Sequence, residues 1–215
     1  MILAKYDNFL FDLDGTLIDS FGDIQHALLR SYRKVLRQEV MITRSHIGPP
    51  LVEMIDVITP GLEVAKKDEV IREFRKEYDH SDYGMTFETE GAMNLLKHLK
   101  SCGKDLYLVT NKAFLPTQNI LRKLDIDFFR DVITPDKMNG KRLTKSELIG
   151  FLIKNYSMDI ARTVMIGDAA QDAMAAGDNS IDSISITGGY DSKENLVQAN
   201  PTFMVGGLSD LHTKL

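Results

Sequence analysis

Short apolar runs recur along the chain with the length of buried β-strands, and helical patterns separate most of them. Six runs predict strands, at residues 8–13, 105–109, 131–134, 163–166, 181–186 and 202–205. Between them, residues 90–100 and 144–155 place leucines at helical spacing, and the second segment opens with Thr144 and Glu147 in capping-box register. Strands that alternate with helices predict an α/β fold, a doubly wound parallel sheet with helices on both faces.

One long interval lacks any strand pattern. From residue 20 to about residue 83 only helical patterns occur, at Phe21, Ile24, Leu28, Tyr32 and Val35, over residues 51–58, and at Val70, Ile71, Phe74 and Tyr78. We therefore predict an α-helical cap over residues 19–83, inserted after the first strand into a core of residues 1–18 and 84–215. Such an insert is expected to cover the strand ends as a lid. The alternative is an ordinary helical flank of the core.

Composition narrows the class of protein. The chain has 215 residues, 43% of them hydrophobic, and a formal charge of −5, which argues against nonspecific binding to nucleic acid. Its single cysteine, Cys102, cannot form an intrachain disulfide, and no apolar run is long enough to span a membrane. We expect a cytoplasmic protein, monomeric or homodimeric, that binds neither nucleic acid nor membrane.

Two carboxylates follow the first predicted strand directly. Asp12 and Asp14 stand behind Phe9-Leu10-Phe11, and Gly15 allows a sharp turn, so Asp12 is expected at the floor of a site and Asp14 above it. An aspartate can act as a nucleophile towards phosphorus while a second one transfers protons. A hard cation such as Mg²⁺ would relieve their mutual repulsion. The simpler alternative is a solvated Asp-Gly turn.

The second predicted strand runs into Thr110-Asn111-Lys112, whose hydroxyl, amide and ammonium groups can bind phosphate oxygens. An ordinary helix N-cap is the competing interpretation. A basic cluster follows the third strand, at Lys137, Lys141, Arg142 and Lys145. Charge runs are usually solvated, but a cation at a helix start is unfavourable unless an anion lies nearby. If Lys145 is partly solvated, its charge should contribute little to the free energy of unfolding.

The predicted strand at residues 163–166 leads into Gly167-Asp168, and Asp172 follows four residues later. At that spacing the two carboxylates fall on one side of an early helical turn, where both could approach a metal ion. An aspartate at a helix start is also a common cap, so this pair alone does not decide the question.

Taken together, these segments resemble the four motifs of the haloacid dehalogenase-like hydrolase superfamily: Asp12-x-Asp14-Gly15-Thr16, Thr110-Asn111, a lysine before the next strand, and Gly167-Asp168-x-x-x-Asp172. The string from Phe11 to Ser20, the segment Ile47-Gly48-Pro49-Pro50-Leu51, and Gly188-Gly189-Tyr190 are similar to the phosphoglycolate phosphatase-like branch and its nucleotidase-like relatives. The resemblance implies a Rossmann-like core with a helical cap.

The resemblance also implies roles for single residues. Asp12 would be the nucleophile, Asp14 the general acid and base, and Thr110 a ligand of the phosphoryl oxygens. Lys145 would neutralise nucleophile and phosphate, with Lys141 as the alternative because the Lys-Pro of many relatives is absent here. Mg²⁺ would be bound by Asp12, the Asp14 carbonyl and Asp168, supported by Asp172. The further substrate-binding residues would be Gly15, Thr16, Asn111 and Lys141.

The expected function is that of a Mg²⁺-dependent, phosphoglycolate phosphatase-like enzyme, which hydrolyses a small phosphorylated metabolite through an aspartyl-phosphate. A dehalogenase is disfavoured because Asp14 supplies an acid that a halide does not need. A sugar-phosphate mutase uses the same acid pair, although Thr16 resembles the phosphatases more. A nucleotidase or pyrophosphatase of the same fold, and a non-catalytic phosphometabolite-binding protein, are the remaining alternatives.

Overall fold

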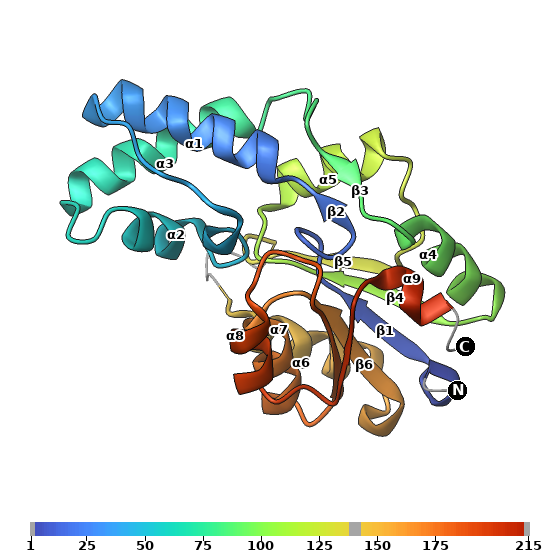
Figure 1. Ribbon diagram of the computed structural model, residues 1–215. Helices are drawn as coiled ribbons and strands as arrows, with labels where there is room; N and C mark the ends of the chain where they lie inside the picture. The colour runs from blue at the N-terminus through green and yellow to red at the C-terminus, as the bar shows by residue number, and fades with distance from the viewer. Residues whose placement is uncertain (1–2, 138–142, 213–215) are drawn as a thin grey trace.

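A parallel six-stranded sheet forms the centre of the computed structural model, which describes residues 3–137 and 143–212 (Figure 1). Its strand order is β5-β4-β1-β6-β7-β8. The strands are β1 (Asn8–Phe11), β4 (Asp105–Val109), β5 (Asp131–Ile133), β6 (Thr163–Gly167), β7 (Asp182–Ile186) and β8 (Phe203–Val205). All six predicted strands are confirmed, and β1 lies between β4 and β6, with Asn8 opposite both Asp105 and Thr163.

Helices cover both faces of this sheet, as the doubly wound prediction requires. Alternate residues of β1 show why: Phe9 and Phe11 pack on one face and Leu10 on the other. The helices α4 (Ala92–Ser101), α5 (Phe114–Lys123) and α9 (Leu208–His212) cover the first face, and α6 (Lys145–Tyr156), α7 (Ala170–Asp178) and α8 (Lys193–Gln198) lie on the other side (Figure 1). The sheet is therefore buried on both sides.

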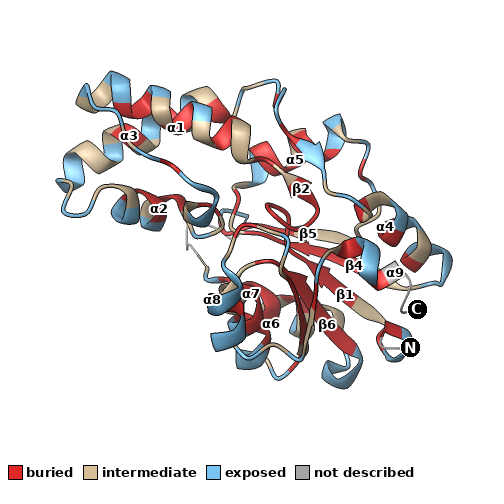
Figure 2. Ribbon diagram, in the orientation of Figure 1, coloured by how far each residue is buried: buried red, intermediate tan, exposed pale blue. Residues whose placement is uncertain are grey.

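The helical insert, hereafter the cap, consists of α1 (Phe21–Leu36), α2 (Leu51–Ile58) and α3 (Val64–Tyr78). It leaves and re-enters the core through a two-stranded antiparallel ribbon of β2 (Ile18–Asp19) and β3 (Phe87–Glu88), which the sequence pattern did not predict. One buried apolar cluster runs from Phe9 in the core to Leu28 and Phe74 in the cap (Figure 2). The cap is thus packed on the core.

Asp23, in the first turn of α1, links the start of the cap to the segment that leads from the cap back to β3. Its carboxylate accepts hydrogen bonds from the Met85 backbone N–H (3.0 Å) and the Thr86 hydroxyl (2.6 Å). Within the described ranges, none of the helices combines the length and the hydropathy that a membrane span requires.

Candidate active site

Three buried carboxylates meet at the carboxyl ends of β1 and β6. Asp12 follows β1 and is fixed there by a hydrogen bond from its backbone N–H to the Ile166 carbonyl (2.9 Å). Asp168 follows β6, and Asp172 lies in the first turn of α7. One carboxylate oxygen from each of the three lies within 4.8 Å of the others. This geometry brings together the residues that the sequence placed at different strand ends.

Glycines provide the space for these carboxylates. Gly15 has a φ of +84°, and a Cβ atom there would lie 2.1 Å from Asp168 Oδ2. A Cβ atom on Gly167 would lie 2.1 Å from Asp172 Oδ2. These distances are far below van der Waals contact, so both positions require glycine on steric grounds, and Gly15 also requires it for its backbone conformation.

Replacing Gly15 with alanine is expected to destabilise the protein and to displace Asp168. The positive φ should contribute about 1–2 kcal/mol of strain, and the clash with Asp168 about 1–3 kcal/mol more. Gly61→Ala is the matched control, because Gly61 has a φ of +77° with no atom near its Cβ position. Urea unfolding of both variants isolates the clash, and equal losses of stability would contradict it.

Lys145 lies between the carboxylates. Thr144 caps α6 through the expected capping box with Glu147, so Lys145 is the first residue of the helix. Its ammonium lies 3.0 Å from Asp12 Oδ1 and 2.5 Å from Asp172 Oδ1, and the residue is only 2% exposed. The interpretation of Lys145 as a partly solvated cation is therefore wrong. Lys141, the alternative candidate for the lysine of the site, lies outside the described residues.

Burial and crowding change the protonation of this group. Burial, followed by repulsion from the neighbouring aspartates, raises the pKa of Asp12 well above its ordinary value, although Lys145 opposes the shift. Burial and the charge of Asp172 raise the pKa of Asp168 to about 7. Burial alone would lower the pKa of Lys145, but attraction to Asp12 and Asp172 outweighs it and raises the pKa.

Asp14 lies beside this group and faces the cap. It forms an ion pair with Lys112 (3.1 Å) and accepts a hydrogen bond from the Ser20 hydroxyl. Lys112 also donates to the hydroxyl of Tyr78 on α3 (2.7 Å), so this buried lysine joins the loop after β4 to the cap. The sequence indicated a strand-end ammonium at this position but gave no sign of its pairing with Asp14.

The remaining predicted residues also lie around this group. Thr110 is buried at the end of β4, and Thr16 donates to Asp168 Oδ1 (2.7 Å). Asn111 reaches the cap, because its amide donates to the Gly48 carbonyl (2.9 Å) and to Gln171 Oε1 (2.7 Å). Thr16 and Asn111 therefore contact protein groups, and their predicted contacts with substrate stay predictions.

A cavity lies between this group and the cap. From the core it is lined by Asp14, Asn111 and Lys112, and from the cap by residues that include Ile47, Leu51, Met54, Phe74, Arg75 and Tyr78. Its walls are thus mainly apolar, with acidic and basic groups at the core end and Arg75 on the cap side. This is where a bound molecule would contact both Asp14 and the cap.

The donor set fits a hard divalent cation. The four aspartates face only two ammonium groups, those of Lys145 and Lys112, so the acidic side chains outnumber the basic ones by two. Mg²⁺ is bound in proteins by a few carboxylate oxygens and keeps several of its water ligands. Asp172 makes the shorter ion pair with the Lys145 ammonium, at 2.5 Å against 3.0 Å for Asp12, so Asp12 and Asp168 are the better candidates to hold Mg²⁺.

Comparison with known proteins agrees with this geometry. The sequence profile described as "Haloacid dehalogenase-like hydrolase" matches residues 9–186. The chain belongs to the haloacid dehalogenase-like hydrolase family. This hydrolase is 28% identical to a 5'-nucleotidase of Pseudomonas aeruginosa, over 98% of this chain and 96% of the relative. It is also 28% identical to a phosphoglycolate phosphatase of Colwellia psychrerythraea, over 98% and 97%.

A solved structure of similar sequence supports the same assignment. A predicted phosphatase from Clostridium acetobutylicum superimposes on this hydrolase with a TM-score of 0.87 and 28% identity, over 97% of each chain. The predicted α/β fold and superfamily are therefore confirmed.

Proposed function

We propose that this hydrolase is a Mg²⁺-dependent phosphatase, which hydrolyses a small phosphorylated metabolite through an aspartyl-phosphate on Asp12. The observation that carries the proposal is the position of Lys145, which is buried between Asp12 and Asp172 in a group of carboxylates with excess negative charge. A phosphate group needs such a cation, and the carboxylates need a second one. The same position favours Lys145 over Lys141 as the lysine of the site.

In the proposed reaction, Asp12 attacks phosphorus while the bond from phosphorus to the leaving oxygen breaks. Asp14 gives its proton to that oxygen and then takes a proton from the water that attacks the phosphoenzyme, which releases inorganic phosphate. Lys145 orients Asp12, and Thr110 donates to the phosphoryl oxygens. Mg²⁺, held by Asp12, Asp168 and the Asp14 carbonyl, would supply positive charge opposite the phosphoryl oxygens.

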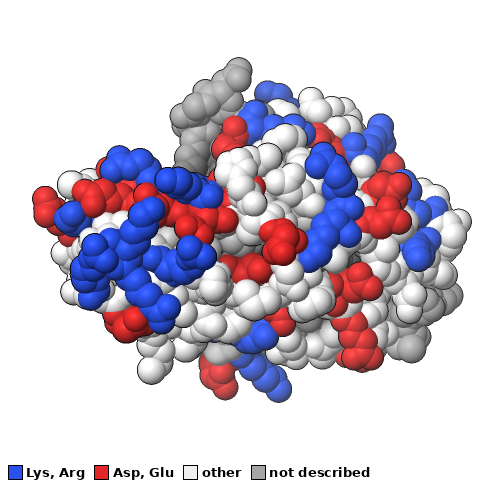
Figure 3. Space-filling model, turned by 90° about the horizontal axis from the view of Figure 1, so that it is seen from above, with Lys and Arg blue, Asp and Glu red and all other residues white. Residues whose placement is uncertain are grey.

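The cavity beneath the cap supports a leaving group that is small and partly apolar. Its apolar wall comes from all three cap helices and from Ile47 before α2, and the cap packs closely enough for Asn111 and Lys112 to reach it. The basic residues on the outside of α1 do not suggest a nucleic-acid surface, because Arg30, Arg33 and Lys34 pair with glutamates (Figure 3). Relatives with phosphoglycolate phosphatase and 5'-nucleotidase activities define the first esters to test.

The deciding experiment measures phosphate release from phosphoglycolate, sugar phosphates, nucleoside monophosphates and pyrophosphate by the purified chain. We expect release that requires added Mg²⁺ and stops with a chelator. An isomerised product without free phosphate would instead indicate a mutase. Binding of these compounds without turnover in the presence of Mg²⁺ would indicate a non-catalytic phosphometabolite-binding protein.

Asp14→Asn should discriminate between leaving groups. An aryl phosphate needs little protonation of its leaving oxygen, so phosphoenzyme formation should fall by about 10-fold or less with it and by about 10²–10⁴-fold with an alkyl phosphate. Rapid-quench measurement of the phosphoenzyme with both esters tests this expectation. Losses of the same size for the two esters would count against Asp14 as the general acid.

A further inference from the structure

The N-terminus of α1, the first helix of the cap, lacks the usual hydrogen bond to its N-cap side chain. The first N–H groups of a helix have no partner within it, and a serine at the N-cap usually accepts from them. Ser20 occupies the N-cap of α1, yet its side chain makes no capping hydrogen bond; its hydroxyl instead donates to Asp14. Ser20 is fully buried, so its backbone N–H needs an acceptor, and the N–H of Phe21 has one in Asp19 Oδ1 (3.1 Å).

Tyr190, in the loop after β7, supplies that acceptor. Its hydroxyl oxygen accepts from the N–H groups of Ser20 (2.7 Å) and Phe21 (3.0 Å), and its proton goes to Asp19 Oδ1 (2.8 Å). The phenol thereby uses one donor and two acceptor positions, which is its full capacity. A core residue thus completes the first turn of a cap helix.

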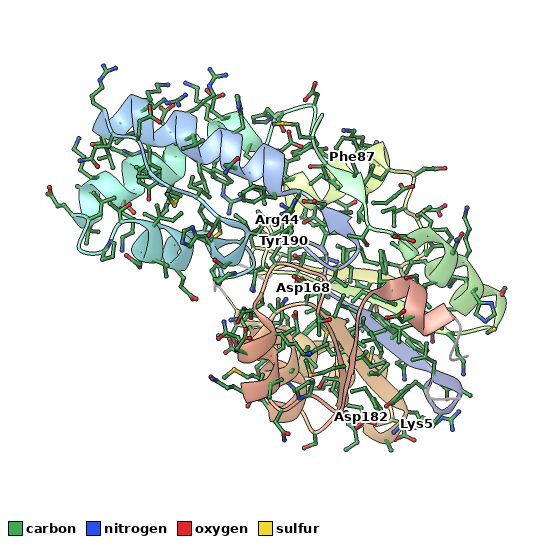
Figure 4. All side chains as sticks on the ribbon, viewed as in Figure 1. Lys5, Arg44, Phe87, Asp168, Asp182 and Tyr190 are labelled. Atoms are coloured by element: carbon green, nitrogen blue, oxygen red, sulfur yellow. The ribbon has the colours of Figure 1, made fainter. Side chains whose placement is uncertain are left out.

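The same tyrosine also holds a carboxylate of the candidate metal site. Its backbone N–H donates to Asp168 Oδ2 (2.7 Å), and Figure 4 shows Tyr190 and Asp168 close together beneath the cap. The loop lies so near that a Cβ atom on Gly189 would be 2.2 Å from Asp168 Cβ. Movement of this loop would therefore move Asp168.

Arg44 connects the cap to this arrangement. It lies between α1 and α2, and its guanidinium makes two hydrogen bonds to Asp19, of 2.9 and 2.8 Å. It also lies over the rings of Phe21 (4.9 Å) and Tyr190 (5.3 Å). Paired hydrogen bonds combined with stacking fix the direction of an arginine as well as its distance.

We propose that Tyr190, Asp19 and Arg44 form a clasp that holds the cap against the core and so keeps Asp14 and Asp168 oriented for reaction. The phenol holds the backbone of Ser20, whose hydroxyl holds Asp14, and the Tyr190 backbone holds Asp168, so one junction positions both carboxylates. The inference rests on the proposed function for the chemistry of those two groups. Tyr190 and Arg44 are positioning residues, since neither reaches the cavity lining.

Hydrogen exchange of the metal-free protein tests the clasp without any assay of activity. Tyr190→Phe removes only the phenolic oxygen, and Arg44→Met removes the exposed guanidinium. We expect either change to accelerate exchange at the start of α1 and in the β2–β3 ribbon by about tenfold or more. Arg33→Met is the matched control, because Arg33 makes a comparable exposed pair with Glu39 on the cap but contacts neither Asp19 nor Tyr190. Unchanged exchange in either clasp variant, or equal acceleration in the control, would overturn the proposal.

Kinetics supply the second readout. With a phosphate ester that the wild-type protein hydrolyses, we expect both clasp variants to raise KM and to lower kcat, each by about tenfold, because productive binding requires the cap in place and reaction requires Asp14 and Asp168 to be oriented. The rise in KM of the double variant should be smaller than the product of the rises in the two single variants. A rise equal to that product would overturn the coupling between Tyr190 and Arg44. Absence of turnover in the wild-type protein would contradict the proposed function and leave the exchange result to decide the clasp.

Discussion

Asp12→Asn is expected to lower turnover by at least about 10³-fold, since an amide cannot form the phosphoenzyme. The same change should not harm the fold. Asp12 is buried among Asp14, Asp168 and Asp172, and its charge is opposed by Lys145 alone. Removing one of several crowded negative charges relieves repulsion. Without metal, the melting temperature of the variant should therefore be no lower than that of the wild type and up to about 2–4 °C higher.

Two measurements check this expectation together. Rapid quenching with a ³²P-labelled ester should trap label on the wild-type protein and none on the variant, and calorimetry without metal should give the melting temperatures. Label retained on Asp12→Asn would refute Asp12 as the nucleophile. Loss of activity accompanied by a large fall in melting temperature would instead indicate a structural role for the carboxylate.

Lys145→Met should lower both activity and stability. The variant would leave Asp12 and Asp172 buried without their cation, and breaking a buried pair in this way costs about 3–5 kcal/mol. Because the orphaned carboxylates become neutral when they take up protons, the deficit should shrink as the pH falls. Turnover should fall by about 10²–10³-fold, since the charge that faces the phosphate is lost.

Lys137→Met is the matched control for stability. Lys137 also pairs with an aspartate, Asp131 at 2.7 Å, but its side chain is 38% exposed, so its removal should cost less than about 1 kcal/mol. Urea unfolding across a range of pH values compares the two variants. Lys141→Met should mainly weaken substrate binding, and a larger fall in kcat for it than for Lys145→Met would transfer the catalytic role to Lys141.

The strands could be predicted because a parallel sheet covered on both faces requires continuous apolar runs, and such runs can be recognised in the amino-acid sequence. The β2–β3 ribbon could not, because each strand has only two residues and both residues of β3 are exposed, including Phe87 at 60%. No alternation can develop over two residues. That ribbon exists because the two ends of the cap must meet at the same edge of the core.

For the site, residue types at strand ends were enough to predict which aspartates would meet. The sequence could not reveal the burial of Lys145, which depends on α6 directing its first residue beneath β1 and towards α7. Nor could it reveal that the Tyr190 phenol would accept from the backbone N–H of Ser20, because those two residues are 170 positions apart. Pairings of this kind are set by the tertiary structure.

The position of β1 at the centre of the sheet has a consequence for synthesis on the ribosome. Its partners begin at residues 105 and 163, so Asp12, the proposed nucleophile, stays without its sheet until most of the chain has been made. The antiparallel pair α1 and α3 is complete by residue 78 and needs only local contacts. The helical segment is therefore expected to become compact first, and the chemistry becomes available only when translation is nearly finished.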